Sequence, residues 1–185
     1  MLLLIMFSYF SSYIFGTESN KLEQKESKEI VQIIDKQPKK INKSLTPKLP
    51  LIKNPKCFYY LSLILEEDNS WSIHGLWPQY SINRYPKFCR DIDFNVKKIE
   101  PIKADLEKYW YSNKGTDDNF WKHEYLKHGT CNFNDLNELE YFKTTLDLYL
   151  NVIDLNYPER FYNENTKKCL IPINRSLKVF EIDFD

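Results

Sequence analysis

Two of the three histidines of this 185-residue chain, His123 and His128, lie close together and enclose Glu124 and Lys127. On a helix, Glu124, Lys127 and His128 would be three or four residues apart and share one face, with His123 beside it. Imidazoles donate and accept protons near neutral pH, and a nearby ammonium favours an anionic substrate. The segment therefore has the residue types of a site for acid–base chemistry on an anion.

Two more ordinary interpretations apply to the same residues. A His–Glu pair on a helix is commonly a solvated ion pair without a catalytic role. A zinc site of the His-Glu-x-x-His type needs histidines four residues apart, whereas His123 and His128 are five apart and point roughly 140° away from each other on a helix. The four cysteines include no Cys-x-x-Cys pair, which argues against a zinc site built from cysteines. We therefore expect neither a metal nor another cofactor.

The third histidine, His74, lies in the segment Ile-His-Gly-Leu-Trp-Pro at residues 73–78. Together with His-Glu-Tyr-Leu-Lys-His-Gly-Thr-Cys at residues 123–131, this segment closely resembles the two active-site segments of the ribonuclease T2 family, in the family's order. All three histidines of the chain fall on histidine positions of the family. The resemblance extends over roughly residues 57–185 and is strongest at the two motifs.

The resemblance implies a metal-independent endoribonuclease that cleaves single-stranded RNA. In such a reaction the 2′-hydroxyl attacks the adjacent phosphorus and gives a 2′,3′-cyclic phosphate, which water then opens to a 3′-phosphate. DNA lacks the 2′-hydroxyl and is not a substrate. By resemblance His128 is the general base and His74 the general acid, although the two roles could be exchanged. His123 would hold the phosphate, Lys127 would offset charge in the transition state, and Glu124 would orient or polarise the site.

The same resemblance implies that Trp77 stacks on a base, a contact that any base tolerates, with Tyr80 as a second candidate. Trp77 precedes Pro78, so its ring could instead pack beneath the loop. Many members of the family carry Asp where this chain has Gln79. An amide both donates and accepts hydrogen bonds, so a base preference does not carry over.

A catalytically idle relative that keeps the fold in order to bind RNA or protein is the alternative to an enzyme. Loss of function usually erodes the acid–base residues of a site, and none of them is missing from this sequence. The sequence therefore favours an active ribonuclease.

The resemblance also implies a disulfide, because in the family the cysteine that ends the second motif pairs with one downstream of the first. Here these cysteines are Cys131 and Cys89. The bridge would close a loop of about 40 residues, stabilise the fold by about 4 kcal/mol in the chain-entropy treatment, and tether the helix end near His128. Cys57 and Cys169 then remain as candidates for a second pair. An even number of cysteines is typical of exported proteins.

The composition, 42% hydrophobic and 16% aromatic, is enough for one well-buried core in a chain of this length. The formal net charge is zero, but residues 17–56 carry 10 basic and 5 acidic side chains, and residues 57–185 carry 16 basic and 21 acidic ones. A protein that grips long nucleic acids through their phosphates usually has a basic domain. The acidic balance instead favours an enzyme that holds one or two nucleotides in a cleft. We expect a monomer.

Residues 1–16 are apolar with small and hydroxyl residues near their end, which is typical of a secretory signal peptide, although the usual positive start is missing. The stretch is short for a membrane span, so contact with a membrane is expected only if it is retained as an anchor. Residues 17–56, rich in Lys and Pro, are predicted to be a flexible leader or linker, and residues 57–185 the catalytic domain. We expect a secreted protein, or one of the secretory and lysosome-like pathway.

Two strands are predicted at the first motif, and the second of them carries it. Residues 57–65 are a nearly continuous apolar run of strand length, and residues 71–76 form a second strand on which Ser72, His74 and Leu76 would face one side. A strand is a rigid support for a catalytic histidine.

Three helices are predicted further along the chain. Pro101 would open the first, and the motif helix would follow with Asp117 or Asp118 as its N-cap and Gly129 as its C-cap. Asn137 and Glu140 resemble a capping box for the third helix, whose inner face would consist of Leu139, Phe142, Leu146, Tyr149, Leu150 and Ile153.

The last segment, residues 177–185, alternates in polarity and is predicted to be a strand that closes the sheet. Together these elements predict an α+β domain in which helices pack on an antiparallel sheet.

Overall fold

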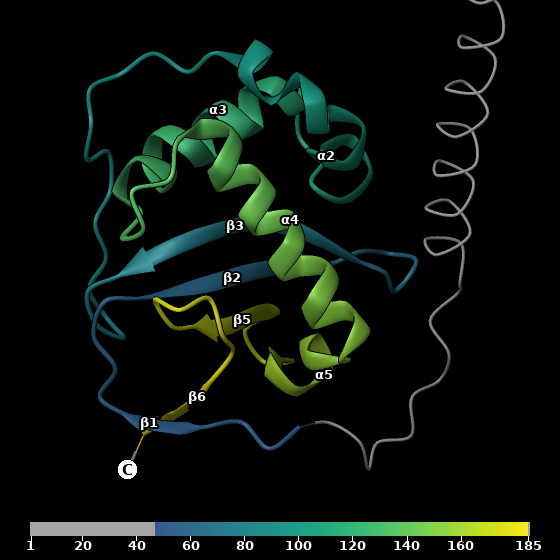
Figure 1. The fold of residues 1–185 in the computed structure, drawn as a ribbon. Helices are drawn as coiled ribbons and strands as arrows, with labels where there is room; N and C mark the ends of the chain where they lie inside the picture. Colours follow the sequence, from purple (N-terminus) through teal and green to yellow (C-terminus); the bar gives the residue numbers. More distant parts are fainter. Residues whose placement is uncertain (1–46, 185) are drawn as a thin grey trace, which may run out of the picture. The chain divides into compact units, whose positions relative to one another are not determined.

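The computed structural model describes residues 47–184. The predicted signal peptide or anchor at residues 1–16 and most of the predicted leader at residues 17–56 lie outside the described residues. The main sheet has four strands in the order β3–β2–β5–β4, and every neighbouring pair is antiparallel. Helices pack on this sheet, so the predicted α+β architecture is confirmed (Figure 1). The strands are β2 (Phe58–Leu65), β3 (Trp71–Gln79), β4 (Tyr162–Asn163) and β5 (Lys168–Ile173).

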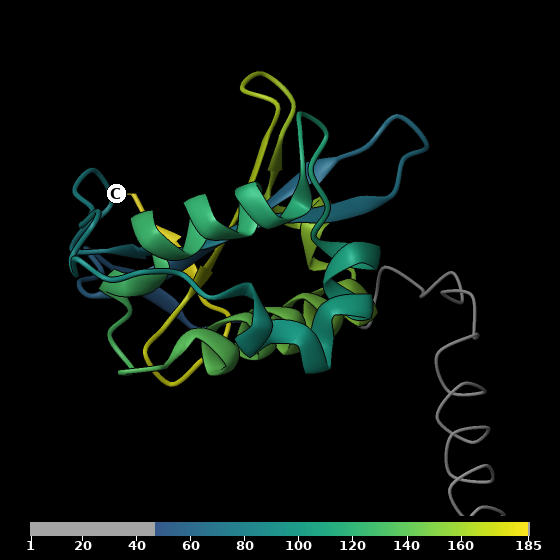
Figure 2. The same ribbon diagram turned by 90° about the horizontal axis from the view of Figure 1, so that it is seen from above.

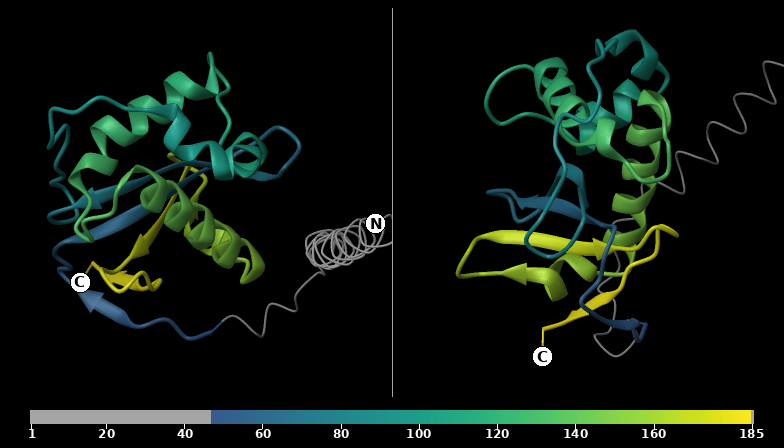
Figure 3. Two further views of the ribbon diagram at one scale, coloured as in Figure 1. Left: turned by 45° about the horizontal axis from the view of Figure 1, so that its top comes forward. Right: turned by 90° about the vertical axis from the view of Figure 1, so that its left-hand side faces the viewer.

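One helix, α4 (Glu138–Asp154), lies across the face of the sheet that carries the core, as the views in Figures 1 and 3 show. Alternate residues of β2 point into this core: Tyr59, Leu61 and Leu63 are buried in the same cluster as Phe142 and Leu146 of α4. The remaining helical elements are η2 (Val96–Ile102), α2 (Lys103–Tyr109), α3 (Asp117–Lys127), η3 (Gly129–Cys131) and α5 (Tyr157–Phe161). No helix within residues 47–184 is long and apolar enough to cross a membrane.

The start of α4 matches the prediction, and its inner face does so only in part. The capping box is present, because Asn137 Oδ1 accepts from the Glu140 backbone N–H while the Glu140 carboxylate accepts from the Asn137 N–H. Leu150, predicted to face inward, is 47% exposed, whereas Tyr141 and Val152 are fully buried. Apolar residues occur on more than one side of this helix, so the sheet and the neighbouring helices decide which side is covered. Pro101 does not open a helix but lies inside η2.

The predicted C-terminal strand forms, but it does not close the main sheet. β6 (Glu181–Asp183) pairs in parallel with β1 (Leu51–Lys53) in a separate two-stranded sheet. The chain turns back after β5, where the Asn174 N–H donates to the Lys178 carbonyl. Val179 forms a single bridge to Ile173 at the end of β5, and only the residues after it leave the main sheet to pair with β1. Leu49 is 9% exposed within the core. The folded domain therefore begins before Cys57, inside the segment predicted as a leader.

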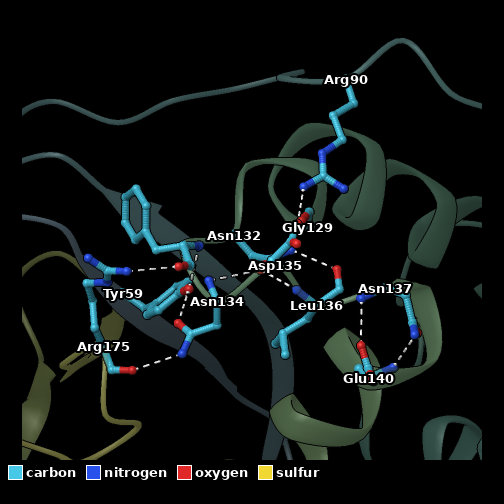
Figure 4. A network of polar contacts seen from close by, with 11 residues as sticks. Tyr59, Arg90, Gly129, Asn132, Asn134, Asp135, Leu136, Asn137, Glu140 and Arg175 are labelled. Carbon is cyan, nitrogen blue, oxygen red and sulfur yellow. Dashed lines mark hydrogen bonds and ion pairs between the residues drawn. The ribbon is translucent and has the colours of Figure 1, made fainter.

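Asn132 holds the loop that joins α3 to α4. Its Nδ2 donates to the carbonyl oxygens of Gly129 (2.8 Å) and Leu136 (2.9 Å), and its Oδ1 accepts from the backbone N–H groups of Asn134 and Leu136 (Figure 4). The Tyr59 hydroxyl donates to Asn134 Oδ1 at 2.7 Å. The residues that follow the second motif are thereby fixed to β2 by satisfied hydrogen bonds.

Candidate active site

His74 is the extra residue of a β-bulge in β3. In the pairing with β2, Ser62 lies opposite Gly75 and Leu63 lies opposite Ile73, so His74 has no partner. The predicted alternation is wrong here, because Ile73 and Leu76 are both fully buried in the core. The inserted residue lets the strand bury both of these side chains and still turn His74 outward, as bulges beside functional sites commonly do.

The second motif lies on α3 as predicted, but the ends of the helix differ from the prediction. The N-cap is Thr116, whose hydroxyl accepts from the Asn119 N–H, and Asp117 and Asp118 occupy the first turn. Gly129 is not a left-handed C-cap; the chain continues through it into η3. A Cβ at Gly129 would lie 2.4 Å from Tyr125 Cδ2. This glycine is therefore needed for close packing rather than for turn geometry.

Glu124 joins the two motifs. It is 2% exposed, and its Oε2 accepts a hydrogen bond of 2.8 Å from Trp77 Nε1. Its Oε1 lies 4.0 Å from Nε2 of His74. A Cβ on Gly75 would come within 2.2 Å of Glu124 Oε2 and 2.6 Å of Trp77 Nε1. The glycine of the first motif therefore leaves the space in which the carboxylate and the indole meet.

Trp77 packs between the two histidines. Its ring stacks on His128 with a centroid distance of 5.3 Å and an interplanar angle of 27°, and it contacts His74 edge-on at 5.0 Å. His128 is consequently buried, with 4% of its surface exposed. One face of the Trp77 ring is thus covered by an imidazole, so a stacked base would have to use the other face.

Tyr80, the second stacking candidate, lies apart from this cluster. Its side chain is 40% exposed, with the Arg84 guanidinium 5.2 Å from the ring centroid and Phe133 at 6.1 Å. Phe120, which the sequence reasoning missed, has its ring 5.8 Å from that of His74. Its only sequence signal is that it stands three residues before His123 on α3.

Burial shifts the pKa values of the two most enclosed groups in opposite directions. Desolvation raises the pKa of Glu124 to about 7, against the lowering effects of the Trp77 hydrogen bond and the Lys127 charge. Desolvation lowers the pKa of His128 to about 3, helped by the charges of Lys127, His123 and His74. In both cases a buried site disfavours the charged form.

The histidines that are more open to solvent shift less. Desolvation, Lys127 and His123 lower the pKa of His74, whose side chain is 41% exposed. Desolvation and Lys127 also lower the pKa of His123, which is exposed on α3. Lys127 acts on every one of these groups, so its ammonium is the common electrostatic neighbour of the cluster.

His128 also carries an unpaired polar atom. Within residues 47–184, its Nδ1 is the one buried side-chain nitrogen or oxygen without a hydrogen-bond partner. A buried nitrogen without a partner carries a desolvation cost. An arriving hydroxyl group could reduce this cost by bonding to the imidazole.

A disulfide secures the end of α3. Cys89 and Cys131 are joined with a Cα–Cα distance of 5.1 Å, as the resemblance implied. Two hydrogen bonds also hold the loop at Cys89 against this helix end. The Phe88 N–H donates to the Lys127 carbonyl at 3.0 Å, and the Cys89 N–H donates to Thr130 Oγ1 at 3.1 Å. The candidate second pair does not form.

The two remaining cysteines have separate environments. Cys57 is half-buried at the start of β2, whereas Cys169 is buried on β5 with its thiol directed to the Pro158 carbonyl. Burial raises the pKa of the Cys169 thiol to about 12, so it is expected to be unreactive. In the part of the chain that the structure describes, no three His, Cys, Asp or Glu side chains gather as ligands for a metal ion.

Comparison with known proteins identifies ribonucleases as relatives of this chain. The model of the ribonuclease T2 family matches residues 50–166. Ribonuclease DdI of Dictyostelium discoideum is 40% identical over 88 residues, which cover 45% of this chain and 39% of that protein. Ribonuclease T2-A of Mus musculus is 40% identical over 92 residues, which cover 46% of this chain and 34% of that protein. The chain thus spans well under two thirds of the length of these curated relatives.

Solved structures share the fold at lower identity. Ribonuclease MC1 from bitter gourd seeds superposes with a TM-score of 0.55 at 18% identity, covering 70% of this chain and 94% of that chain. An RNase-related protein from Calystegia sepium gives a TM-score of 0.55 at 20% identity, covering 71% of this chain and 93% of that chain. The family match extends over more than half of the sequence and includes both histidine segments. The chain therefore belongs to the ribonuclease T2 family.

Proposed function

We propose that this protein is a metal-independent endoribonuclease that cleaves single-stranded RNA. The observation that carries the proposal is the packing of His74 and His128 against Trp77, whose indole N–H donates a hydrogen bond to buried Glu124. The family relatives are ribonucleases by name. Variants of ribonuclease MC1 have been solved in complex with 5′-GMP and with 5′-UMP, which supports a nucleotide ligand for this site.

The reaction follows from the proton affinities of the two histidines. Because burial and the neighbouring charges lower its pKa, His128 is the histidine that stays neutral at mildly acidic pH and can accept the proton of the 2′-hydroxyl. The resulting O2′ bonds to phosphorus, and the bond from phosphorus to the 5′-oxygen breaks. His74, the more exposed imidazole, donates a proton to that leaving oxygen. These affinities favour His128 as base and His74 as acid over the exchanged assignment.

The other groups act on the phosphate and on its developing charge. The Lys127 ammonium and His123, in its protonated form, would stabilise the crowded dianionic phosphorane. Glu124 with a pKa raised to about 7 is largely a neutral acid below that pH, so it can donate a hydrogen bond to a phosphoryl oxygen while still accepting one from Trp77. Water then opens the cyclic phosphate by the reverse proton transfers.

The test is incubation of the purified protein with single-stranded RNA and with DNA of the same sequence in EDTA. We expect cleavage of RNA to 2′,3′-cyclic phosphate and then 3′-phosphate ends, with DNA intact. The His74→Ala variant, purified in the same way, controls for contaminating nucleases and should lose about 10²–10⁴-fold in kcat. Cleavage that stops on chelation and returns with a divalent cation would refute the proposal. A folded protein that binds RNA without cleaving it would identify the catalytically idle alternative.

We also propose that the protein is exported to the secretory or lysosome-like pathway. The Cys89–Cys131 disulfide supports this, because such bonds persist mainly in oxidising compartments. Locating the full-length protein with a C-terminal tag would decide the question, and retention in the cytosol would contradict it.

A further inference from the structure

A groove of about 740 Å³ extends from His74 and Trp77 along the main sheet, on the side away from α4. Its floor includes Ile64 and Leu170, which are half-buried and alternate with the core residues of β2 and β5. This volume lies in the range of ligand-binding sites. The groove is continuous with the candidate active site, so a substrate bound at His74 has an open path along it.

The two walls of the groove carry opposite charge. The turns of the β2–β3 and β4–β5 hairpins project on the same side of the molecule, away from α4 (Figure 2). The first turn contributes Glu66 and Glu67, and the second contributes Lys167 and Lys168. The Glu66 carboxylate accepts hydrogen bonds from the side chains of Ser72 and Asn113.

The two lysines of the second wall are available for a ligand. Both Lys167 and Lys168 are exposed, and neither forms an ion pair with another described residue. They stand in a domain whose charge is acidic overall. An anion that enters the groove is therefore attracted to this wall and repelled by the glutamate wall.

We propose that Lys167 and Lys168 bind the next phosphate of the RNA strand, on the 3′ side of the phosphate that reacts. This inference rests on the proposed ribonuclease function. His74, as the acid, faces the 5′-oxygen of the departing 3′ segment, and the groove begins at His74. The departing segment therefore enters the groove, where its backbone follows the lysine wall and its bases lie over the apolar floor.

The backbone conformation at Lys167 allows a substitution that removes the charge without disturbing the turn. Lys167 has a φ of 56°, the left-handed conformation that Gly and Asn adopt more readily than Lys. The turn before it is held by a hydrogen bond from the Thr166 N–H to Asn163 Oδ1 at 3.0 Å. Lys167→Asn should therefore keep or improve the turn while it removes the ammonium. Turn geometry by itself does not favour a lysine at this position.

The experiment uses DNA oligonucleotides that each contain a single ribonucleotide, so that only one phosphate can react. The minimal substrate has one deoxynucleotide after the ribonucleotide. The other two are extended by three deoxynucleotides, either on the 3′ side or on the 5′ side. The wild-type protein should show a several-fold higher kcat/KM for the 3′-extended substrate than for the minimal one. In the double variant Lys167→Asn, Lys168→Gln this ratio should fall towards one.

Salt provides a second readout. The slope of log(kcat/KM) against log salt for the 3′-extended substrate should fall by up to ~0.7 for each lysine removed, because fewer counterions are released. Lys143→Gln is the matched control: this lysine is exposed on α4, on the other side of the sheet, and its loss should change neither the ratio nor the slope.

The outcomes separate the two proposals. If the wild-type protein cleaves none of the three substrates, the ribonuclease function itself fails. If it cleaves them but the double variant keeps the wild-type ratio, the lysine subsite is wrong while the ribonuclease function stands. A preference for the 5′-extended substrate would mean that the nucleic-acid strand runs through the groove in the opposite direction, and it would also contradict the proposed subsite.

Discussion

Burial gives two side chains of the candidate site proton affinities that their types alone would not predict. His128 stacks on the Trp77 ring, and Glu124 accepts a hydrogen bond from Nε1 at the edge of the same indole. The pKa of His128 falls to about 3 and that of Glu124 rises to about 7. At mildly acidic pH both side chains are therefore uncharged, which is the state that a histidine base and a hydrogen-bonding carboxylic acid require.

These affinities predict an acidic optimum. The rate should rise as pH increases through about 3, where His128 becomes neutral, and should fall as His74 loses its proton at a pKa below its usual 6.5. Measuring kcat/KM from about pH 2 to about pH 9 tests this, because that parameter reports groups of the free enzyme. Lys127→Met should move both limbs to higher pH, because the Lys127 charge lowers both pKa values. Lys122→Met, on the same helix, is the control. A rate that still climbs above about pH 9 would contradict the mechanism.

The same two groups make stability depend on pH with opposite signs. Between about 3 and 6.5 the unfolded His128 binds a proton that the folded one does not, so stability rises with pH. Between 4.5 and about 7 the folded Glu124 holds a proton that the unfolded one has lost, so stability falls with pH. The two effects oppose each other where the ranges overlap.

Glu124→Gln separates these contributions. Removing the titrating carboxyl should abolish the falling limb, worth ~3 kcal/mol for a shift of this size, and leave the rising limb in place. Urea unfolding at pH values near 4.5 and near 7 measures the difference. The Gln side chain can still accept the Trp77 hydrogen bond, so a general loss of stability at both pH values would show that packing, rather than titration, is responsible.

At the scale of elements, the site depends on a strand that departs from regular alternation and on a helix that packs against its edge. The bulge at His74 turns the imidazole outward while Ile73 and Leu76 stay buried. Gly75 next to it leaves room for Glu124 from α3. The geometry of the site is thus fixed where β3 and α3 meet.

Gly75→Ala tests this contact. The added Cβ would lie 2.2 Å from Glu124 Oε2, so either the carboxylate or the indole must move and their hydrogen bond must break. We expect kcat to fall by at least about tenfold while the far-ultraviolet circular dichroism stays unchanged. Ser62→Ala, directly opposite Gly75 on β2, introduces no such clash and should retain most of the activity. Full activity of Gly75→Ala would mean that the Glu124–Trp77 contact is dispensable.

For the molecule as a whole, one covalent link connects the two parts of the chain that meet at the site. The Cys89–Cys131 bridge spans 42 residues and joins the loop after β3 to η3. The Asn132 loop anchors the same region to β2 and the C-terminal turn, where Asn134 Nδ2 donates to the Arg175 carbonyl. The end of α3 that carries His128 is therefore held from two sides.

Removing this bridge should weaken both the fold and the site. In the Cys89→Ser, Cys131→Ser variant we expect a loss of stability of about 4 kcal/mol from the freed loop, measured by urea unfolding. Activity should fall at denaturant concentrations below the unfolding transition, because the end of α3 loosens first. Cys57→Ser removes a free thiol and serves as the control. Equal stability of the bridged and unbridged proteins would contradict this role.

The sequence by itself determined the features that depend on residues close together in the chain. The two motifs predicted all three histidines, Glu124 and Lys127 as one cluster, and in the folded chain the charges of Lys127, His123 and His74 lower the pKa of His128. An apolar run predicted β2, and capping signals predicted the motif helix, although its N-cap is Thr116 rather than Asp117 or Asp118. A capping box is a short-range signal, and the predicted one forms at the start of α4.

Only the tertiary structure decided features that require distant segments to meet. The bulge at His74 depends on pairing with β2, and the parallel pairing of β6 with β1 joins the two ends of the domain. Burial of His128 beneath Trp77 is the largest cause of its lowered pKa, and this burial could not be deduced from the motif. The groove with its lysine wall likewise exists because two hairpins, about 100 residues apart in the chain, project side by side. Such contacts depend on how the chain packs, which no local spacing encodes.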